Sequence, residues 1–211
     1  MKLILASGSP RRRELLERFG LPFLVLSVDT DESVPAGTPA VDAPGMLSRR
    51  KADAAFDRLG DPDALILAAD TVVVCDGALL GKPTGSADAA RMLRLLSGRT
   101  HEVVTGITLR RGDRCLTRSE QTLVRFLPLS EENIAAYIAS GEPMDKAGAY
   151  GIQGLAAAFI PEIRGDYFNV MGLPLCLLSE MLREFGTDLL GGVLLKRYSP
   201  ERSGLFWRPR W

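Results

Sequence analysis

The fold is decided by residues 3–16, which read Leu3-Ile-Leu-Ala-Ser7-Gly-Ser9-Pro10-Arg11-Arg12-Arg-Glu-Leu-Leu16. The apolar start predicts a short buried strand, the Ser-Gly-Ser segment predicts a tight turn, and the remainder predicts a helix. Proline suits the first helical position because its missing N–H would be unpaired there, and serine suits the N-cap before it. A strand, a turn and a helix therefore open the chain.

The turn between this strand and this helix has two interpretations. It directs free backbone N–H groups, the Ser7 and Ser9 hydroxyls and the positive end of a helix to one point, and Arg11 and Arg12 follow at once. It is therefore a candidate site for phosphate or another anion. The alternative is a well-capped helix with a solvated basic face, which is common. These residues alone leave both interpretations open.

The composition is that of an ordinary globular chain. Of its 211 residues, 46% are hydrophobic and 25% are charged, which is typical of soluble proteins. The 26 basic and 26 acidic residues give a formal net charge of zero. Broad electrostatic binding to nucleic acid or to an anionic membrane is therefore not expected, although a local basic cluster is compatible with this balance.

Targeting features and cysteines indicate a cytoplasmic protein. The start MKLILASGSP becomes polar too soon for a signal peptide, and no apolar run approaches the length of a membrane span. Cys75, Cys115 and Cys176 are far apart in apolar stretches, which predicts buried, reduced thiols. Their spacing matches neither a zinc site nor a disulfide framework.

Strand and helix signals alternate along the chain. We expect helices over residues 10–19, 43–59, 86–96, 130–140 and 174–185, and strands over residues 2–6, 23–27, 64–69, 101–109, 115–126 and 156–160. The strand over residues 64–69 runs into Asp70, and residues 71–75 are expected to continue extended. Asp76-Gly77 predicts a hairpin, and the turn over residues 110–114 joins a second strand pair. This pattern favours one α/β domain with a mixed, partly antiparallel sheet flanked by helices. We assign residues 1–185 to this domain and residues 186–211 to a C-terminal extension without an assigned role.

Asp70 is the first candidate for chemistry. It follows the apolar run over residues 65–69 and is expected at the carboxyl end of a buried strand. Ligands of α/β sheets gather at such ends, and a partly desolvated carboxylate there can serve as a general base. The alternative is an aspartate that caps a turn. The neighbouring Thr71 either donates its hydroxyl to a ligand or is an ordinary strand residue.

Further carboxylates and lysines extend this candidate site. Asp31 and Glu32 lie in an acidic loop and, with Asp70, form a candidate oxygen-ligand site for Mg²⁺ or Mn²⁺. Lys51 and Lys82 are candidate phosphate contacts, and Lys82 lies in a Leu-Gly-Lys-Pro turn directly after the hairpin. The plain alternatives are a solvated loop and exposed lysines without a ligand.

The second strong feature is the loop Gly141-Glu-Pro-Met-Asp-Lys146-Ala-Gly-Ala-Tyr-Gly-Ile-Gln153-Gly154. Its glycines permit close approach of the backbone to a ligand, and the Gln153 amide can read a base edge because it both donates and accepts. The spacing is not that of a dinucleotide fingerprint, and no Walker A sequence is present. An ordered loop without a ligand is the alternative. His101, the single histidine, has no partner that indicates a nucleophilic hydrolase.

Several of these segments together resemble the Maf family. The matching segments are Ala6-Ser-Gly-Ser-Pro-Arg-Arg12, Ala69-Asp-Thr71, Leu80-Gly-Lys-Pro83, Ser97-Gly-Arg-Thr-His101, the loop over residues 141–154, and Gly165-Asp-Tyr-Phe-Asn-Val-Met-Gly-Leu-Pro174. The resemblance extends over about residues 1–185, and its specificity lies in the order of the motifs. It implies the α/β fold of Maf and inosine triphosphate pyrophosphatase-like proteins.

The resemblance also implies hydrolysis of a nucleoside triphosphate to the monophosphate and pyrophosphate. The Lys-Ala-Gly-Ala-Tyr-Gly-Ile-Gln-Gly segment resembles the branch that acts on dTTP and UTP. Asp70 matches the position of the family's general base, and Arg12, Thr71 and Gln153 match positions associated with substrate choice. Members are linked to clearing of nucleotide pools and to arrest of cell division. One alternative is therefore a pyrophosphatase of the same fold that acts on modified pyrimidine triphosphates, and another is a non-catalytic nucleotide-binding regulator of division. The resemblance further suggests a homodimer.

Together, the residues and the resemblance predict a mechanism. A divalent ion bridges Glu32 and Asp70 to phosphate oxygens, and Asp70 activates a water that attacks the α-phosphorus. Gln153 and Thr71 contact the base. The groups expected to hold the triphosphate are Ser7, Arg11, Arg12, Lys51, Lys82 and Lys146.

Overall fold

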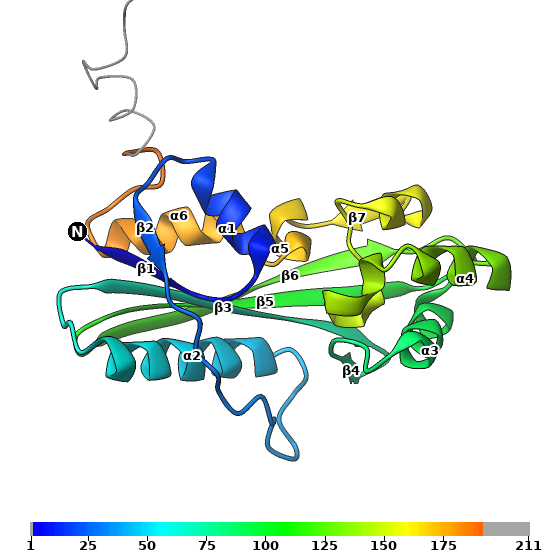
Figure 1. The fold of residues 1–211 in the computed structure, drawn as a ribbon, viewed down its shortest axis with the longest axis horizontal. Coiled ribbons are helices and arrows are strands. Elements are labelled where there is room, and N and C mark those ends of the chain that lie inside the picture. Colours follow the sequence, from blue (N-terminus) through cyan, green and yellow to red (C-terminus); the bar gives the residue numbers. More distant parts are fainter. Residues whose placement is uncertain (1, 192–211) are drawn as a thin grey trace, which may run out of the picture.

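A seven-stranded mixed sheet runs the length of the molecule (Figure 1). The computed structural model describes residues 2–191. Its strands are β1 Leu3–Ala6, β2 Phe23–Val25, β3 Leu65–Cys75, β4 Ala78–Leu80, β5 Thr100–Arg111, β6 Arg114–Arg125 and β7 Glu162–Arg164. Its α-helices are α1 Pro10–Glu17, α2 Ala43–Leu59, α3 Ser86–Leu96, α4 Glu131–Ala139, α5 Tyr167–Met171 and α6 Leu175–Glu184, with 3-10 helices η1 Glu142–Asp145, η2 Ala147–Ala149 and η3 Leu155–Phe159.

The sheet joins a parallel part to an antiparallel part. Its strands lie in the order β2-β1-β3-β5-β6-β7, and β4 pairs with β3 beside this path. β1 is parallel to β2 and β3, whereas the pairs β3–β5, β5–β6 and β6–β7 are antiparallel. The predicted mixed α/β fold and the Asp76-Gly77 hairpin are therefore confirmed.

Alternating side chains of β1 and β3 cover both faces of the sheet. Leu3, Leu65 and Leu67 belong to the core beneath α1 and α6, whereas Ile4 and Ile66 belong to the core beneath α2. Figure 1 shows α2 on one side of the sheet, and α1 and α6 on the other. Burial of both faces explains why these strands read as continuous apolar runs.

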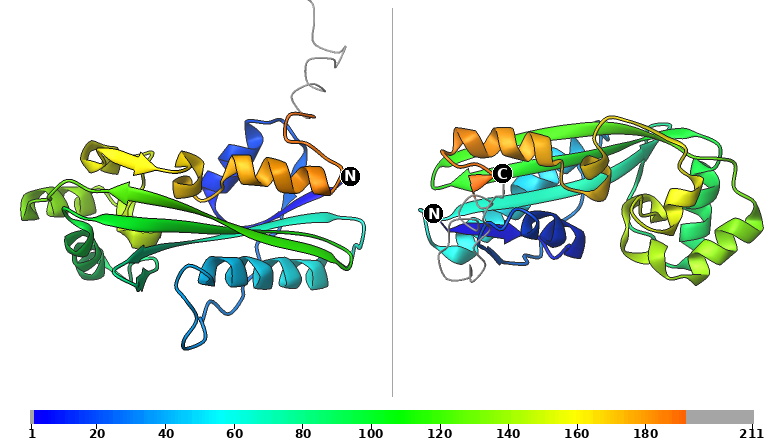
Figure 2. Two further views of the ribbon diagram at one scale, coloured as in Figure 1. Left: turned by 180° about the vertical axis from the view of Figure 1, so that it is seen from behind. Right: turned by 90° about the horizontal axis from the view of Figure 1, so that it is seen from above.

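A third core occupies the other end of the sheet. Val73, Val103 and Val124 pack there with side chains of α3 and α4. Figure 2 shows α3, α4 and the 3-10 segments gathered at this end, away from α1, α2 and α6. The middle of β3 therefore lies between two packed regions.

Asp70 lies in the middle of β3 and not at a strand end, which corrects the prediction. The pairing with β1 ends at Ala6–Ala68, and the pairing with β4 begins at Val73–Leu80. Between them, β3 has no strand partner on that side among the described residues, while it remains paired with β5 on the other. The pairing with β1 thus ends two residues before Asp70 although β3 continues, and Asp70, Thr71 and Val72 line a cavity beside this unpaired stretch.

Other predictions about local structure were wrong. The strand expected over residues 156–160 is the 3-10 helix η3, because an alanine-rich run suits a helical turn as well as a strand. The short elements β7 and α5 were not predicted. Of the three cysteines, Cys75 is buried, Cys115 is partly buried and Cys176 is exposed, because α6 has an outer face.

Two predictions concern the C-terminal extension and membrane-spanning helices. Most of the extension assigned to residues 186–211 lies outside the described residues, because the description ends at residue 191. Among the described helices, none combines the length and the apolar character needed to cross a bilayer.

Candidate active site

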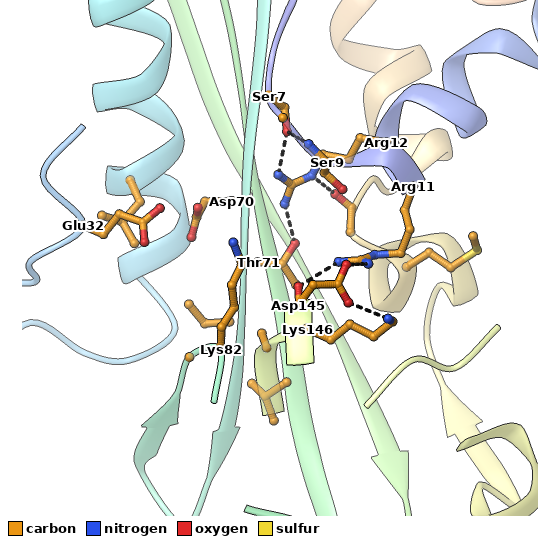
Figure 3. A pocket seen from close by; sticks show the side chains of 18 of the residues that line it. Ser7, Ser9, Arg11, Arg12, Glu32, Asp70, Thr71, Lys82, Asp145 and Lys146 are labelled. Carbon is orange, nitrogen blue, oxygen red and sulfur yellow. Dashed lines mark hydrogen bonds and ion pairs between the residues drawn. The ribbon is translucent and has the colours of Figure 1, made fainter. Parts of the chain in front are cut away.

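A cavity of about 670 Å³ opens beside the middle of β3. This volume is in the range of small-molecule sites, which is roughly 300–1,000 Å³. Except for Asp31, the structure brings together around it the residues that the sequence nominated for substrate, metal or catalysis, and Figure 3 shows most of them. These residues are Ser7, Arg11, Arg12, Glu32, Lys51, Asp70, Thr71, Lys82, Lys146 and Gln153.

The turn between β1 and α1 forms one wall of the cavity. Ser7 is 8% exposed, and its Oγ accepts a hydrogen bond of 3.2 Å from the Ser9 backbone N–H. Ser9 is the N-cap of α1, as predicted, but its hydroxyl accepts no bond from the helix. Because the first N–H groups of a helix have no partner within the helix, those of α1 remain available to an anion.

Arg12 is fixed by contacts from three parts of the chain. Its Nε donates to the Gly172 carbonyl at 2.7 Å, and its two terminal nitrogens donate to Ser7 Oγ at 3.1 Å and Thr71 Oγ1 at 2.9 Å. Burial lowers the pKa of Arg12, and the charge of Asp70 offsets part of this effect. A guanidinium has more N–H donors than these contacts use, so Arg12 can also bind an anion in the cavity.

The Thr71 hydroxyl contacts Arg12 and the Thr105 hydroxyl on the neighbouring strand β5. Thr105 Oγ1 donates to the Asn169 carbonyl at 2.9 Å, so its proton is not available to Thr71. In the 2.9 Å contact between the two threonines, Thr71 is therefore the donor, and its oxygen accepts from Arg12. Its proton is committed to Thr105, so this geometry favours support of Arg12 over contact with a base.

Lys51 lies between the two carboxylates predicted to bind metal. Its Nζ donates to an Asp70 oxygen and, at 3.0 Å, to Glu32 Oε1. The side chains of Lys51 and Asp70 are 14% and 13% exposed, whereas that of Glu32 is 65% exposed. The hydrogen bond from Lys51, and its charge, lower the pKa of Glu32. Lys51 thus holds both carboxylates at one side of the cavity.

A close backbone contact places α2, and hence Lys51, beside Asp70. Gly106 on β5 is the register partner of Asp70, and a Cβ atom on Gly106 would overlap the backbone of Pro44 and Gly45 at the start of α2. Only glycine allows the helix to approach the sheet so closely. Lys51 follows further along α2, and its ammonium reaches Asp70.

Asp145 is a member of the site that the sequence analysis missed. Its carboxylate accepts from Arg11 at 2.7 Å and from Lys146 at 2.6 Å, and it lines the cavity (Figure 3). Asp145 lies within a segment that the resemblance marked, but its contact with Arg11 joins residues far apart in sequence, which the sequence alone does not reveal.

Lys82 makes no ion pair within residues 2–191. Figure 3 shows its side chain extended toward Asp70 and Thr71.

The loop over residues 141–154 closes the opposite side of the cavity. The Gly148 N–H donates to the Gly81 carbonyl at 3.0 Å, which ties this loop to the Lys82 turn. Gly148 has a φ of 69°, and a Cβ atom there would lie 2.8 Å from a Val73 methyl carbon. Tyr150 also lines the cavity. Its hydroxyl lies 2.8 Å from Nε2 of the buried His101.

Of the predicted metal ligands, Asp31 does not join the site. Its carboxylate accepts from the backbone and side chain of Ser33 at 2.8 and 2.6 Å, so it closes its own turn and does not line the cavity. Within residues 2–191 no group of three or more His, Cys, Asp or Glu side chains could hold a metal ion. Glu32 and Asp70 remain as a pair of oxygen donors.

The open mixed sheet, and a cavity lined by five basic side chains, four carboxylates and a helix N-terminus, define an α/β protein whose cavity suits a polyanion. The chain belongs to the Maf family, because the family model described as "Maf-like protein" matches residues 2–185.

Curated relatives match over almost their whole length. A protein of Symbiobacterium thermophilum is 54% identical over 192 residues, which are 90% of this chain and 97% of the relative. A protein of Moorella thermoacetica is 52% identical over 195 residues, or 91% and 99% of the two chains. Both relatives carry the name dTTP/UTP pyrophosphatase. Among solved structures, the Staphylococcus aureus Ham1 protein has a TM-score of 0.45 at 14% identity over 60% of this chain and 72% of that chain.

Proposed function

We propose that this protein is a nucleoside triphosphate pyrophosphatase that hydrolyses dTTP and UTP to the monophosphate and pyrophosphate. One observation supports this most. A single cavity is lined on one side by Asp70, Lys51 and Glu32, which contact one another, and on the other by Arg12, which is hydrogen-bonded to Ser7 and Thr71. Relatives with the name dTTP/UTP pyrophosphatase share more than half of their sequence with this chain.

In the proposed mechanism, the chain's own residues position the triphosphate and a water. Arg12, Ser7 and the N-terminus of α1 bind phosphate oxygens, and Asp70 accepts a proton from the water that attacks the α-phosphorus. Lys82 and Arg11 meet the charge of the departing pyrophosphate. Phosphoryl transfer depends mainly on positioning and on charge stabilisation, and these groups supply both.

A divalent cation, Mg²⁺ or Mn²⁺, fits the donors of this cavity. Glu32 and Asp70 are hard oxygen ligands that contact the same Lys51 ammonium, and Mg²⁺ is usually held by one or two carboxylates together with substrate phosphates. When bound, the ion would neutralise charge on the phosphates and polarise them. The role of Lys51 would then be to hold Asp70 and Glu32 in place.

The test is an assay of pyrophosphate release across dTTP, UTP, CTP, ATP and dGTP, with Mg²⁺, with Mn²⁺ and with EDTA. We expect pyrophosphate and the monophosphate from dTTP and UTP, and no turnover in EDTA. Release of orthophosphate would contradict the proposal. Nucleotide binding without turnover would instead identify a non-catalytic regulator.

An Asp70→Asn variant tests the general base. General-base catalysis contributes about 10²–10⁴-fold, so kcat should fall by that factor while the variant still binds dTTP and unfolds at a similar temperature. Asp113→Asn is the matched control, since Asp113 is exposed and does not line the cavity. Normal turnover by a folded Asp70→Asn variant would remove Asp70 from this role.

A further inference from the structure

We propose that Glu142 and Tyr137 are positioning residues that fix the backbone on both sides of Gln153 and thereby determine the preference for pyrimidine triphosphates. Neither side chain lines the cavity. The inference rests on the proposed function, because it concerns how the same site selects its base.

Each oxygen of the Glu142 carboxylate is used within the loop. Oε1 accepts a hydrogen bond of 2.8 Å from the Tyr137 hydroxyl, and Oε2 accepts one of 2.9 Å from the Leu155 backbone N–H. The Tyr137 oxygen in turn accepts a bond of 3.1 Å from the Gly151 backbone N–H. Gly151 and Leu155 flank Gln153 symmetrically. We call Glu142 and Tyr137, with these hydrogen bonds, the brace.

The brace is anchored in the hydrophobic core beside α4. Tyr137 lies on α4 and is 5% exposed, and its ring packs edge-on against Phe159 with a centroid distance of 5.3 Å. Burial, and then the hydrogen bond to Glu142, raise the pKa of the Tyr137 phenol, so it remains a donor. The Glu142 N–H donates to Ser140 Oγ at 3.2 Å, which fixes Glu142 relative to α4.

Two glycines of the loop are explained by the brace. A Cβ atom on Gly154 would overlap the Glu142 carboxylate, and one on Gly151 would lie 2.7 Å from Lys146 Cε. The Lys146 ammonium donates to the Glu142 carbonyl at 2.7 Å. The sequence analysis assigned these glycines to close approach of a ligand. Within the protein, the close approach at these two glycines is made by Glu142 and Lys146.

Gln153 itself depends on this support. Its side chain is exposed, lines the cavity and forms no hydrogen bond with the rest of the described chain. Its amide is therefore available to a ligand, and its position follows from the backbone that the brace holds. Misplacement of a recognition group by a small distance lowers discrimination without removing the reacting groups.

The test compares kcat and KM for dTTP and dGTP in Tyr137→Phe, Glu142→Ala and Glu142→Gln. We expect Tyr137→Phe and Glu142→Ala to lower the ratio of kcat/KM for dTTP over dGTP about tenfold, mainly through a higher KM for dTTP. Tyr137→Phe removes the acceptor of the buried Gly151 N–H, and Glu142→Ala removes the acceptors of the Leu155 N–H and the Tyr137 hydroxyl. Glu142→Gln should retain most of the ratio, since an amide can accept from Leu155 and donate to Tyr137. Tyr167→Phe is the matched control, because the Tyr167 hydroxyl makes no hydrogen bond within residues 2–191 and does not line the cavity.

An unchanged ratio in folded variants, even with lower activity on both substrates, would overturn the inference, because a merely structural role predicts equal losses. If Glu142→Ala does not fold, Tyr137→Phe decides the question. If the wild-type protein releases no pyrophosphate, the proposed function fails, and equilibrium titration with dTTP and dGTP replaces the kinetic ratio. A wild-type preference that Tyr137→Phe removes would still support the brace, and an unchanged preference or no nucleotide binding would refute it.

Discussion

The buried His101 should make this protein less stable as the pH falls from about 7 to about 4. Burial lowers the pKa of His101 from 6.5 to about 4. In the unfolded chain the imidazole takes up a proton below its ordinary pKa, whereas in the folded protein it stays neutral until the pH reaches about 4. The neutral His101 therefore does not reduce the unfolding free energy above the unfolded pKa. As the pH falls below that value the unfolding free energy decreases, and below about 4 His101 causes no further loss.

The size of this effect follows from the shift. Each pKa unit corresponds to about 1.4 kcal/mol, so between pH 7.5 and pH 4.5 His101 alone should remove about 2–3 kcal/mol of unfolding free energy. The geometry agrees, because His101 Nδ1 is buried without a hydrogen-bond partner among the described residues. A protonated ring would place an unpaired N–H there.

Urea unfolding at both pH values, followed by circular dichroism, measures this effect against a His101→Gln variant. Glutamine stays neutral and can retain a hydrogen bond to Tyr150. The carboxylates titrate in both proteins, so the difference between their pH dependences isolates His101. We expect the loss of stability between the two pH values to be about 2–3 kcal/mol smaller in the variant. Equal losses in the two proteins would refute the reasoning.

Three further predictions concern the cavity. Thr71→Val should lower kcat/KM for dTTP about tenfold or more, because Arg12 loses a charge-assisted hydrogen bond. Thr100 does not line the cavity, so Thr100→Val should leave kcat/KM for dTTP unchanged in the same assay. Gly148→Ala should destabilise the protein by about 1–3 kcal/mol in urea unfolding, since its φ is 69° and the added Cβ would lie 2.8 Å from a valine methyl carbon; a neutral effect would contradict this geometry. Glu32→Gln should raise the Mg²⁺ concentration for half-maximal activity about tenfold, and an unchanged value would exclude Glu32 as a ligand.

The fold could be predicted where local signals and burial agree. The helices expected over residues 43–59 and 86–96 have the observed bounds, because amphipathic spacing and helix-stop signals coincide there. The strand expected over residues 156–160 failed because a short apolar run carries no period, and its neighbours decide its conformation. Asp70 was misplaced at a strand end because the sequence does not reveal where β1 stops pairing with β3.

The site could be predicted as a set of residues but not as a set of pairs. Short motifs marked the residues that meet at the cavity, because polar and glycine residues interrupt the apolar pattern at those points. Asp145 and Glu142 were missed as partners, since an acidic residue in a loop is usually solvated. The contact of Asp145 with Arg11 joins segments that only the fold brings together, whereas the contact of Glu142 with Tyr137 depends on how the chain turns after α4.

The charge around the cavity bears on the two interpretations of the opening turn. The lining holds five basic side chains and four acidic ones, and Asp145 and Asp70 already engage Arg11 and Lys51. The excess of one positive charge is much smaller than the charge of a triphosphate, so a bare triphosphate would meet strong local repulsion from these carboxylates. A divalent ion that accompanies the phosphates would reduce this imbalance and would give Glu32 and Asp70 a cation to bind. The opening turn therefore fits an anion site best when the anion arrives as a metal complex, and binding of dTTP should weaken when Mg²⁺ is removed.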